Sequence, residues 1–318
     1  MRGLTDIAGI KVGHASDLEG LTGCTAVLCE RGAVAGIDIR GSATGSEEWD
    51  LMNPLHLTEK IHAVVLAGGS AFGLEACSGV RRFLEKQGIG FATPYAKVPL
   101  VSGAILYDLG IGKPQARPTR EMGESAAAAA TDDAVAEGNI GAGTGATVGK
   151  VAGMAQAMKS GIGSASAALG GAHAGVMVAA LAAVNAFGDV MDPHTRNVLA
   201  GARRSPTSRE FINTSQAMLQ GLRGGFATNT TLVVVATNAI LTKAQATKVS
   251  QLAHQGMVRA INPVNTSFDG DVVFTLSTGT VAAEINSLGL AAAEVVAESI
   301  VRAVKSAASI GGVPGLKG

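Results

Sequence analysis

The order of apolar segments along the chain is the feature that most constrains its fold. Short runs rich in β-branched residues predict strands, and longer stretches with apolar residues at helical spacing predict helices. The predicted strands are 25–28, 33–39, 63–66, 176–183, 231–236 and 271–276, and the predicted helices are 71–87, 241–260 and 283–306. Because strands and helices are interleaved without the strict alternation of a doubly wound sheet, the sequence favours an α+β protein with mixed sheets covered by helices.

Composition and charge limit the possible classes of function. The chain has 318 residues, of which 47% are hydrophobic, so it can bury a large core without disulfides. Its 25 basic and 25 acidic residues balance and its aromatic content is 3%, which argues against nucleic acid as a partner. Only 16% of the residues are charged, against about 25% in typical domains. This low value predicts that identical subunits cover part of the surface.

Cysteine and histidine usage predicts a compartment and argues against a metal. Cys24, Cys29 and Cys77 are odd in number and form no CxxC pair, which favours a reduced, cytoplasmic protein and disfavours zinc. The six histidines are scattered without ligand spacing, so no metal or other cofactor is expected. The apolar stretch 174–187 is shorter than the about 20 residues that cross a membrane, so no membrane partner is expected either.

The junction between Asn229 and Thr230 is the strongest candidate for chemistry. Thr230 sets a hydroxyl group at the mouth of the predicted strand 231–236, where it can act as a nucleophile. No histidine lies near it in the sequence to serve as its base. A break before Thr230 would supply one, because a free α-amino group has an ordinary pKa of ~7.7–8.0. The preceding segment 203–225, polar and bracketed by glycine, is a pliant stretch that would let the new ends separate, or simply a surface loop. An ordinary loop-to-strand junction is the alternative reading of Thr230 itself.

Two carboxylates follow in the sequence Asp269-Gly270-Asp271. In an extended segment, residues two apart face the same side, so both side chains can point at one site. Such a pair can orient a hydroxyl nucleophile or stabilise an ammonium group. An Asp-Gly hairpin turn is the alternative that the residues leave open. A calcium loop is disfavoured, because its twelfth position would be Leu276 rather than glutamate.

Lys150 and Asn185 are further candidates. Lys150 ends the glycine-rich stretch 141–150, which matches no phosphate-binding loop but lets the backbone approach a substrate closely; a solvated lysine is the alternative. Asn185 is a polar side chain inside an apolar run and must be hydrogen-bonded if buried, either at an oxyanion site or in a structural role.

The stretch Ala67 to Gly73 joins a predicted strand to a predicted helix. Its backbone N–H groups at Gly68 and Gly69 are possible donors to an oxyanion. Because no GxSxG elbow is present, Ser70 is expected to cap the helix rather than to act as a nucleophile.

Taken in order, these motifs resemble the self-processing N-terminal-nucleophile amidohydrolases, the family that includes L-aminopeptidase/D-esterases, β-peptidyl aminopeptidases and nylon-oligomer (6-aminohexanoate-oligomer) hydrolase. The likeness runs nearly end to end. The segments that carry it are 6–14, 22–25, 38–41, 67–73, 98–99, 107–109, 143–150, 184–188 and 229–237. One departure is Asn238, which stands where relatives often have aspartate.

The resemblance implies a fold and a mode of maturation. The family fold is an αββα sandwich, two packed mixed sheets covered by helices, with the nucleophile at the start of an inner strand. It implies one hydrolase domain over 1–318 that cleaves itself between Asn229 and Thr230 into 1–229 and 230–318. A homotetramer is also expected, with a small-molecule amide or peptide as the substrate.

The resemblance also assigns site residues. Thr230 would be nucleophile and base, and Lys150, Asn185 and Tyr107 map onto the active-site lysine, asparagine and tyrosine, with Tyr95 as an alternative to Tyr107. Threonine combined with Asp269 and Asp271 is more similar to the nylon-oligomer branch than to the serine peptidases. The expected reaction is hydrolysis of amide bonds in small peptides or aminoalkanoate oligomers through an acyl-enzyme. An acyltransferase with the same nucleophile and an unprocessed oligomeric binding protein are the alternatives.

Overall fold

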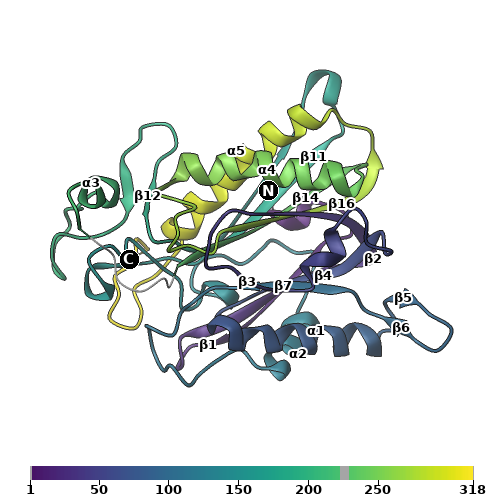
Figure 1. The fold of residues 1–318 in the computed structure, drawn as a ribbon, viewed down its shortest axis with the longest axis horizontal. Coiled ribbons are helices and arrows are strands. Elements are labelled where there is room, and N and C mark those ends of the chain that lie inside the picture. Colours follow the sequence, from purple (N-terminus) through teal and green to yellow (C-terminus); the bar gives the residue numbers. More distant parts are fainter. Residues whose placement is uncertain (1, 223–228, 318) are drawn as a thin grey trace.

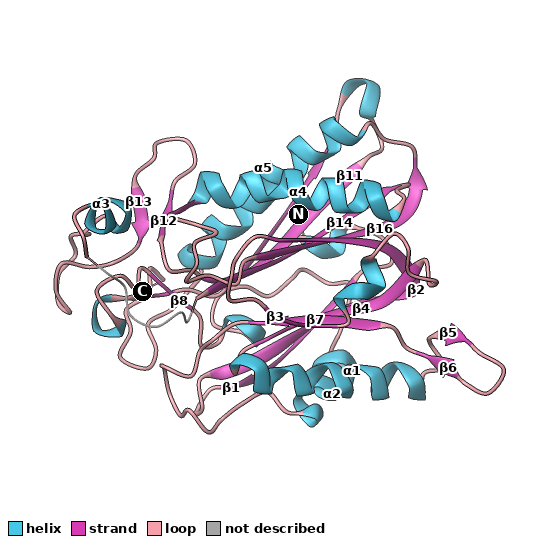
Figure 2. Cartoon of the chain, viewed as in Figure 1, coloured by secondary structure: helices cyan, strands magenta, loops and turns pink. Residues whose placement is uncertain are grey.

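Two layers of β-sheet lie face to face, and each layer carries helices on its outer side (Figure 1). The computed structural model of the chain describes residues 2–222 and 229–317. Figure 2 shows α4 (Lys243–Ala260) and α5 (Ile285–Lys305) above the sheets, and α1 (Glu75–Lys86) and α2 (Arg120–Ala128) below them. The predicted αββα sandwich is therefore confirmed.

The strands of both layers form one hydrogen-bonded sheet. In order across the sheet they are β10 (Ile162–Ala168), β11 (Met177–Asn185), β14 (Thr230–Ala239), β16 (Val272–Val281), β2 (Thr22–Ile39), β4 (Lys60–Ala67), β7 (Val101–Ile105) and β3 (Gly45–Glu47), and β1 (Lys11–Asp17) also pairs with β2. The pairs β14/β16 and β4/β7 are parallel and the others antiparallel, so the sheet is mixed.

The long strand β2 connects the two layers. Its first part pairs with β1 and β4, and its last residues pair with β16. The sequence predicts two strands here, 25–28 and 33–39, but the chain stays extended through the intervening residues and shifts register between Leu28 and Ala33. Gly32, at φ 77°, supplies a backbone conformation that other residues rarely adopt. The local irregularity lets one strand serve both layers.

The apolar run of β14 is explained by burial on both faces. Val233 and Val235 belong to the core beneath α4 and α5, whereas Leu232 and Val234 belong to the core between the two layers of the sheet. A strand covered on both sides reads as a continuous hydrophobic run rather than an alternating one. Because β14 lies between β11 and β16, its first residue, Thr230, lies beside the ends of both of these strands.

The shorter elements lie at the ends of the sandwich. They are α3 (Thr214–Leu219), β5 (Phe91–Ala92), β6 (Lys97–Val98), β8 (Thr147–Val148), β9 (Met158–Lys159), β12 (Asp189–Met191), β13 (Val198–Ala200) and β15 (Ile261–Asn262). Asn238, the departure from the family pattern, joins strand ends, because its side chain accepts from Met177 N and donates to Gly175 O. Across the described ranges, no helix has the length and apolar character that a membrane crossing requires.

Candidate active site

Thr230 is the first residue of β14 and is buried, with 2% of its surface exposed. Its neighbour across the antiparallel pair is Asn185, the last residue of β11. On the other side, Asn229 forms a parallel bridge with Asp269, just before β16 begins. The ends of three adjacent strands therefore bring together residues that lie far apart in the sequence.

The peptide bond between Asn229 and Thr230 has its carbonyl oxygen held by two donors. The Thr230 hydroxyl donates to Asn229 O over 2.5 Å, and the Gly270 N–H donates to the same oxygen over 2.8 Å. The hydroxyl oxygen is therefore beside the carbonyl that it would have to attack. A backbone donor is already aimed at the atom that becomes negatively charged during such an attack.

Asp269 and Asp271 lie beside this junction, just before the neighbouring strand β16 begins. Asp271 accepts from Thr231 N over 2.6 Å and from Asn265 N over 2.9 Å. Asp269 accepts from Phe187 N over 3.1 Å and from the Thr266 hydroxyl. Because Asp269 bridges in parallel to Asn229 and β16 continues parallel to β14, the alternative of an Asp-Gly hairpin turn is wrong.

Both carboxyl groups are buried, and burial disfavours their charged form. Desolvation, followed by the nearby charge of Asp269, raises the pKa of Asp271 to about 7. Desolvation also raises the pKa of Asp269, although the hydrogen bonds from Thr266 and Phe187 act to lower it. Two carboxyl groups buried this close together disfavour each other's ionisation.

Lys150 reaches the same site from the end of the glycine-rich stretch. It is 7% exposed, and its Nζ donates to Asn185 O over 3.0 Å and to Asn185 Oδ1 over 2.8 Å. Desolvation lowers the pKa of Lys150 to about 7, opposed by the charges of Asp269, Asp108 and Asp271. The alternative of a solvated lysine is wrong.

The side-chain amide of Asn185 links the end of β11 to the surrounding loops by hydrogen bonds. Its Oδ1 also accepts from Thr147 N over 3.0 Å, and its Nδ2 donates to Tyr107 O over 2.9 Å. Tyr107 lines a pocket of about 180 Å³ together with Lys150 and Thr147. Tyr95 lies between β5 and β6 and is 98% exposed, so the structure brings Tyr107 and not Tyr95 to this site.

Two buried charged residues beside the site were not among the predicted ones. Asp108 accepts from the Thr22 hydroxyl over 2.7 Å and from Gly69 N over 2.6 Å, and burial raises its pKa to about 6. Lys159 is fully buried, donates to the backbone carbonyls of Gly143, Ala146 and Ser160, and has its pKa lowered to about 7 by burial. Asp108 stands next to Tyr107 in the motif 107–109, a signal that could have identified it. Lys159 carries no such signal.

The stretch 67–73 does not supply the donors expected of it. Gly68 N donates to Gly23 O and Gly69 N donates to Asp108, so both N–H groups serve the fold. Ser70 does not cap the helix: it lies inside a 3-10 turn, Ser70–Leu74, whose N-cap is Gly69 without a side-chain hydrogen bond. The helix α1 begins only after this turn, at Glu75.

The described part of the polar segment 203–225 is held by hydrogen bonds, which does not fit the predicted pliant stretch. The N–H and the hydroxyl of Thr214 both donate to Asp189, and Ile212 N donates to Ala202 O. Residues 223–225 of that segment lie outside the described residues. Within 2–222 and 229–317, no group of His, Cys, Asp and Glu side chains is arranged to hold a metal ion.

Comparisons with known proteins cover almost the whole chain. The profile of peptidase family S58 matches residues 2–317. An uncharacterized aminopeptidase of Mycobacterium tuberculosis is 38% identical, over 99% of this chain and 96% of its own length. A 6-aminohexanoate-oligomer endohydrolase of Kocuria sp. is 29% identical, over 94% of this chain and 85% of its own.

Solved structures share the fold at low sequence identity. The L-aminopeptidase D-Ala-esterase/amidase from Ochrobactrum anthropi, described as a variant of the Ntn hydrolase fold, superposes with a TM-score of 0.73 at 20% identity, over 98% of this chain and 88% of that one. A β-aminopeptidase of Burkholderia sp. superposes with a TM-score of 0.70 at 22% identity, over 99% and 90% of the two chains.

Proposed function

Because the chain belongs to peptidase family S58 and is an amide hydrolase, we propose that it is a self-processing N-terminal threonine hydrolase. Its substrates would be small peptides or aminoalkanoate oligomers, as the similarity to the 6-aminohexanoate-oligomer endohydrolases suggests. The observation that carries the proposal is the 2.5 Å contact between the Thr230 hydroxyl and the Asn229 carbonyl oxygen. A cytoplasmic, reducing location is proposed with it, and the buried free thiols of the three cysteines support that part.

Self-cleavage begins with attack of Thr230 Oγ1 on the carbonyl carbon of Asn229. The C–N bond to Thr230 breaks, the nitrogen takes up the hydroxyl proton, and an ester links Asn229 to Thr230 Oγ1. Water then hydrolyses this ester and leaves a carboxylate on Asn229 and a free amino group on Thr230. The Gly270 N–H, 2.8 Å from the Asn229 oxygen, would stabilise the negative charge of the intermediate.

In the mature enzyme, the freed amino group would act as the base for the hydroxyl of the same residue. Thr230 Oγ1 attacks the substrate carbonyl, the amine leaves with a proton, and the acyl group remains as an ester on Thr230. Water releases the acid in a second step. Asp269 and Asp271 would orient the ammonium form, and Asn185 with backbone N–H groups would hold the oxyanion.

Intact-mass spectrometry with N-terminal sequencing tests the proposal. Wild-type protein is expected to give fragments 1–229 and 230–318, and Thr230→Ala is expected to stay full length and inactive. Thr230→Ser, which keeps the hydroxyl, should still cleave. Two fragments from the Thr230→Ala protein, or a new N-terminus other than Thr230, would rule the mechanism out. Release of free acid from an amide substrate without an added amine acceptor separates hydrolysis from acyl transfer.

A further inference from the structure

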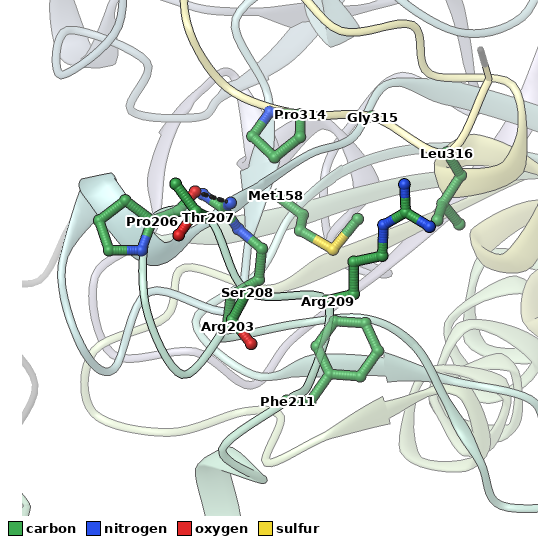
Figure 3. A pocket seen from close by; sticks show the side chains of 10 residues that line it. All are labelled: Met158, Arg203, Pro206, Thr207, Ser208, Arg209, Phe211, Pro314, Gly315 and Leu316. Carbon is green, nitrogen blue, oxygen red and sulfur yellow. Dashed lines mark hydrogen bonds between the residues drawn. The ribbon is translucent and has the colours of Figure 1, made fainter.

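A second pocket lies away from the candidate active site, between the loop 203–211 and the C-terminal residues 314–316 (Figure 3). Its volume is about 760 Å³, within the range of ~300–1,000 Å³ of small-molecule sites. It shares no lining residue with the pocket at Tyr107 and Lys150. The turn after Lys150 separates the two pockets. Met154 in this turn lines the pocket at Tyr107 and Lys150, whereas the carbonyl oxygen of Ala155, one residue further on, accepts from Arg203.

The pocket carries positive charge that no described carboxylate neutralises. Arg203 and Arg209 both line it. The nearest acidic residue in the sequence, Glu210, pairs instead with Arg204, which does not line the pocket. Within the described ranges, neither Arg203 nor Arg209 forms an ion pair with a carboxylate. Two guanidinium groups on one pocket without a counter-charge favour an anion.

Arg203 is held in place and is not merely a surface side chain. It is 7% exposed, and its guanidinium donates to Pro206 O and, over 2.9 Å, to Ala155 O. Its Nε is buried and has no hydrogen-bond partner among the residues that the structure describes. A buried cation whose only described partners are carbonyl oxygens is costly, and an anion bound in the pocket would reduce that cost.

The remaining walls indicate what the rest of the ligand is. Apolar side chains form most of them, and two hydroxyl groups lie on the loop. The apolar residues are Met158, Pro206, Phe211, Pro314 and Leu316, and the hydroxyls belong to Thr207 and Ser208. Figure 3 shows Met158 and Phe211 lying near Arg209. Such a surface suits an apolar chain that ends in a single charged group better than a polyanion.

We propose that this pocket binds a small organic carboxylate with an apolar chain, at a site distinct from the catalytic one. The carboxylate would bind Arg209 and would also be attracted by the positive charge of Arg203. The apolar chain of the ligand would pack on Phe211 and Met158. Acids of this type are also what amide hydrolysis releases. The proposal does not depend on the threonine mechanism, because binding is measured without turnover.

Titration calorimetry of the purified protein with hexanoate tests this, with hexanamide as the neutral probe of equal size, and both titrations are repeated on the Thr230→Ala protein so that hydrolysis of the amide cannot contribute to the heat. Hexanoate should bind at least ~10-fold more tightly than hexanamide, as expected for a charge-assisted contact of about 1.5–3 kcal/mol. Arg209→Gln should remove most of that preference. Arg204→Gln is the matched control, because it removes a charge from the same loop outside the pocket, and it should bind hexanoate as the wild type does. Thermal unfolding of both variants checks that the loop change leaves the fold intact.

Several results would overturn the proposal. Equal binding of hexanoate and hexanamide would show that the charge is not recognised. Unchanged hexanoate binding in Arg209→Gln together with its loss in Lys150→Met would place the carboxylate in the catalytic pocket. If hexanoate does not bind and Arg209→Glu lowers the mass measured by light scattering, the face is a contact between copies of this chain and not a ligand site.

Discussion

Replacing Gly270 by alanine should slow self-cleavage without removing any catalytic side chain. A Cβ atom at this position would lie 2.7 Å from Thr230 Oγ1, about 0.7 Å short of the 3.4 Å at which ordinary contacts begin. The new methyl group cannot retreat, because Ala43 O lies 2.7 Å from it and Ala43 N is bound to Asp269 O. The hydroxyl of Thr230 must therefore move.

The size of the effect follows from that displacement. A misplacement of ~1 Å in a reacting group can cost ~10²-fold in rate, so a shift of about 0.7 Å should slow cleavage by roughly 10- to 100-fold. The assay is the appearance of fragment 230–318 with time, followed by intact-mass spectrometry after purification of the uncleaved precursor at low temperature.

The control for this prediction is Gly170→Ala. The added Cβ at Gly170 meets nothing within 4 Å, and its φ of −106° suits alanine. It should cleave at the wild-type rate. Circular dichroism and thermal unfolding establish that both proteins fold. If folded Gly270→Ala cleaves as fast as the wild type, Thr230 Oγ1 is not the atom that attacks the Asn229 carbonyl.

Three further outcomes are expected. Asp269→Asn and Asp271→Asn should each slow self-cleavage or turnover by ~10²-fold or more, because the two carboxylates position acid–base groups. Near wild-type rates in both variants would contradict this. Lys159 has a pKa lowered to about 7 in the folded chain, so the unfolded chain binds more protons between pH 7 and pH 10 and stability rises with pH in that window. Urea unfolding should therefore show the wild type gaining stability relative to Lys159→Met from pH 7 to pH 9.5, and a constant gap would mean that Lys159 titrates normally. Light scattering at micromolar concentration should give the mass of a tetramer, and a fully active monomer would refute the inference from low surface charge.

The sequence predicts the central strands and the long helices well because their signals are strong. The strands β14 and β16 and the helix α5 appear within a few residues of the predicted ranges 231–236, 271–276 and 283–306. These elements bury large apolar side chains, so the spacing of apolar residues in the sequence directly indicates where they lie.

The strands β1 and β10 and the helix α2 escape prediction for a common physical reason. They pack through small residues, so their buried faces are poor in large apolar side chains. A Cβ on Gly13 of β1 would collide with Ala126 O of α2, and a Cβ on Gly163 of β10 would collide with Ser299 O of α5. At both positions, helix backbone lies directly on the strand. Glycine there permits close packing and at the same time removes the hydrophobic pattern.

In the candidate site, too, some groups could be predicted from the sequence and others could not. Thr230, Asp269 and Asp271 are visible in the sequence because they flank strands. Lys150 and Asn185 are visible as a lysine that ends a glycine-rich stretch and as a polar residue in an apolar run, and the resemblance to a family supplies Tyr107. The structure brings these residues together, and their roles stay predictions. The oxyanion donor could not be read from side chains, because the Gly270 N–H that reaches Asn229 O is a backbone group. Its position depends on the register of β14 against β16, which is a property of the folded sheet.

The charges around Thr230 bear on how the proposed amino-group base would work at neutral pH without a histidine. A free α-amino group has an ordinary pKa of ~7.7–8.0. Nearby carboxylates favour its ammonium form and raise that pKa, whereas a nearby ammonium on Lys150 favours the neutral amine and lowers it. Burial brings the pKa of Asp271 and that of Lys150 each to about 7. Near pH 7 both groups are partly charged and their effects on the amino group oppose each other, whereas the positive charge of Lys150 prevails at lower pH and the negative charge of Asp271 prevails at higher pH. An amine that keeps a pKa near its ordinary value is partly neutral at pH 7, as a general base must be.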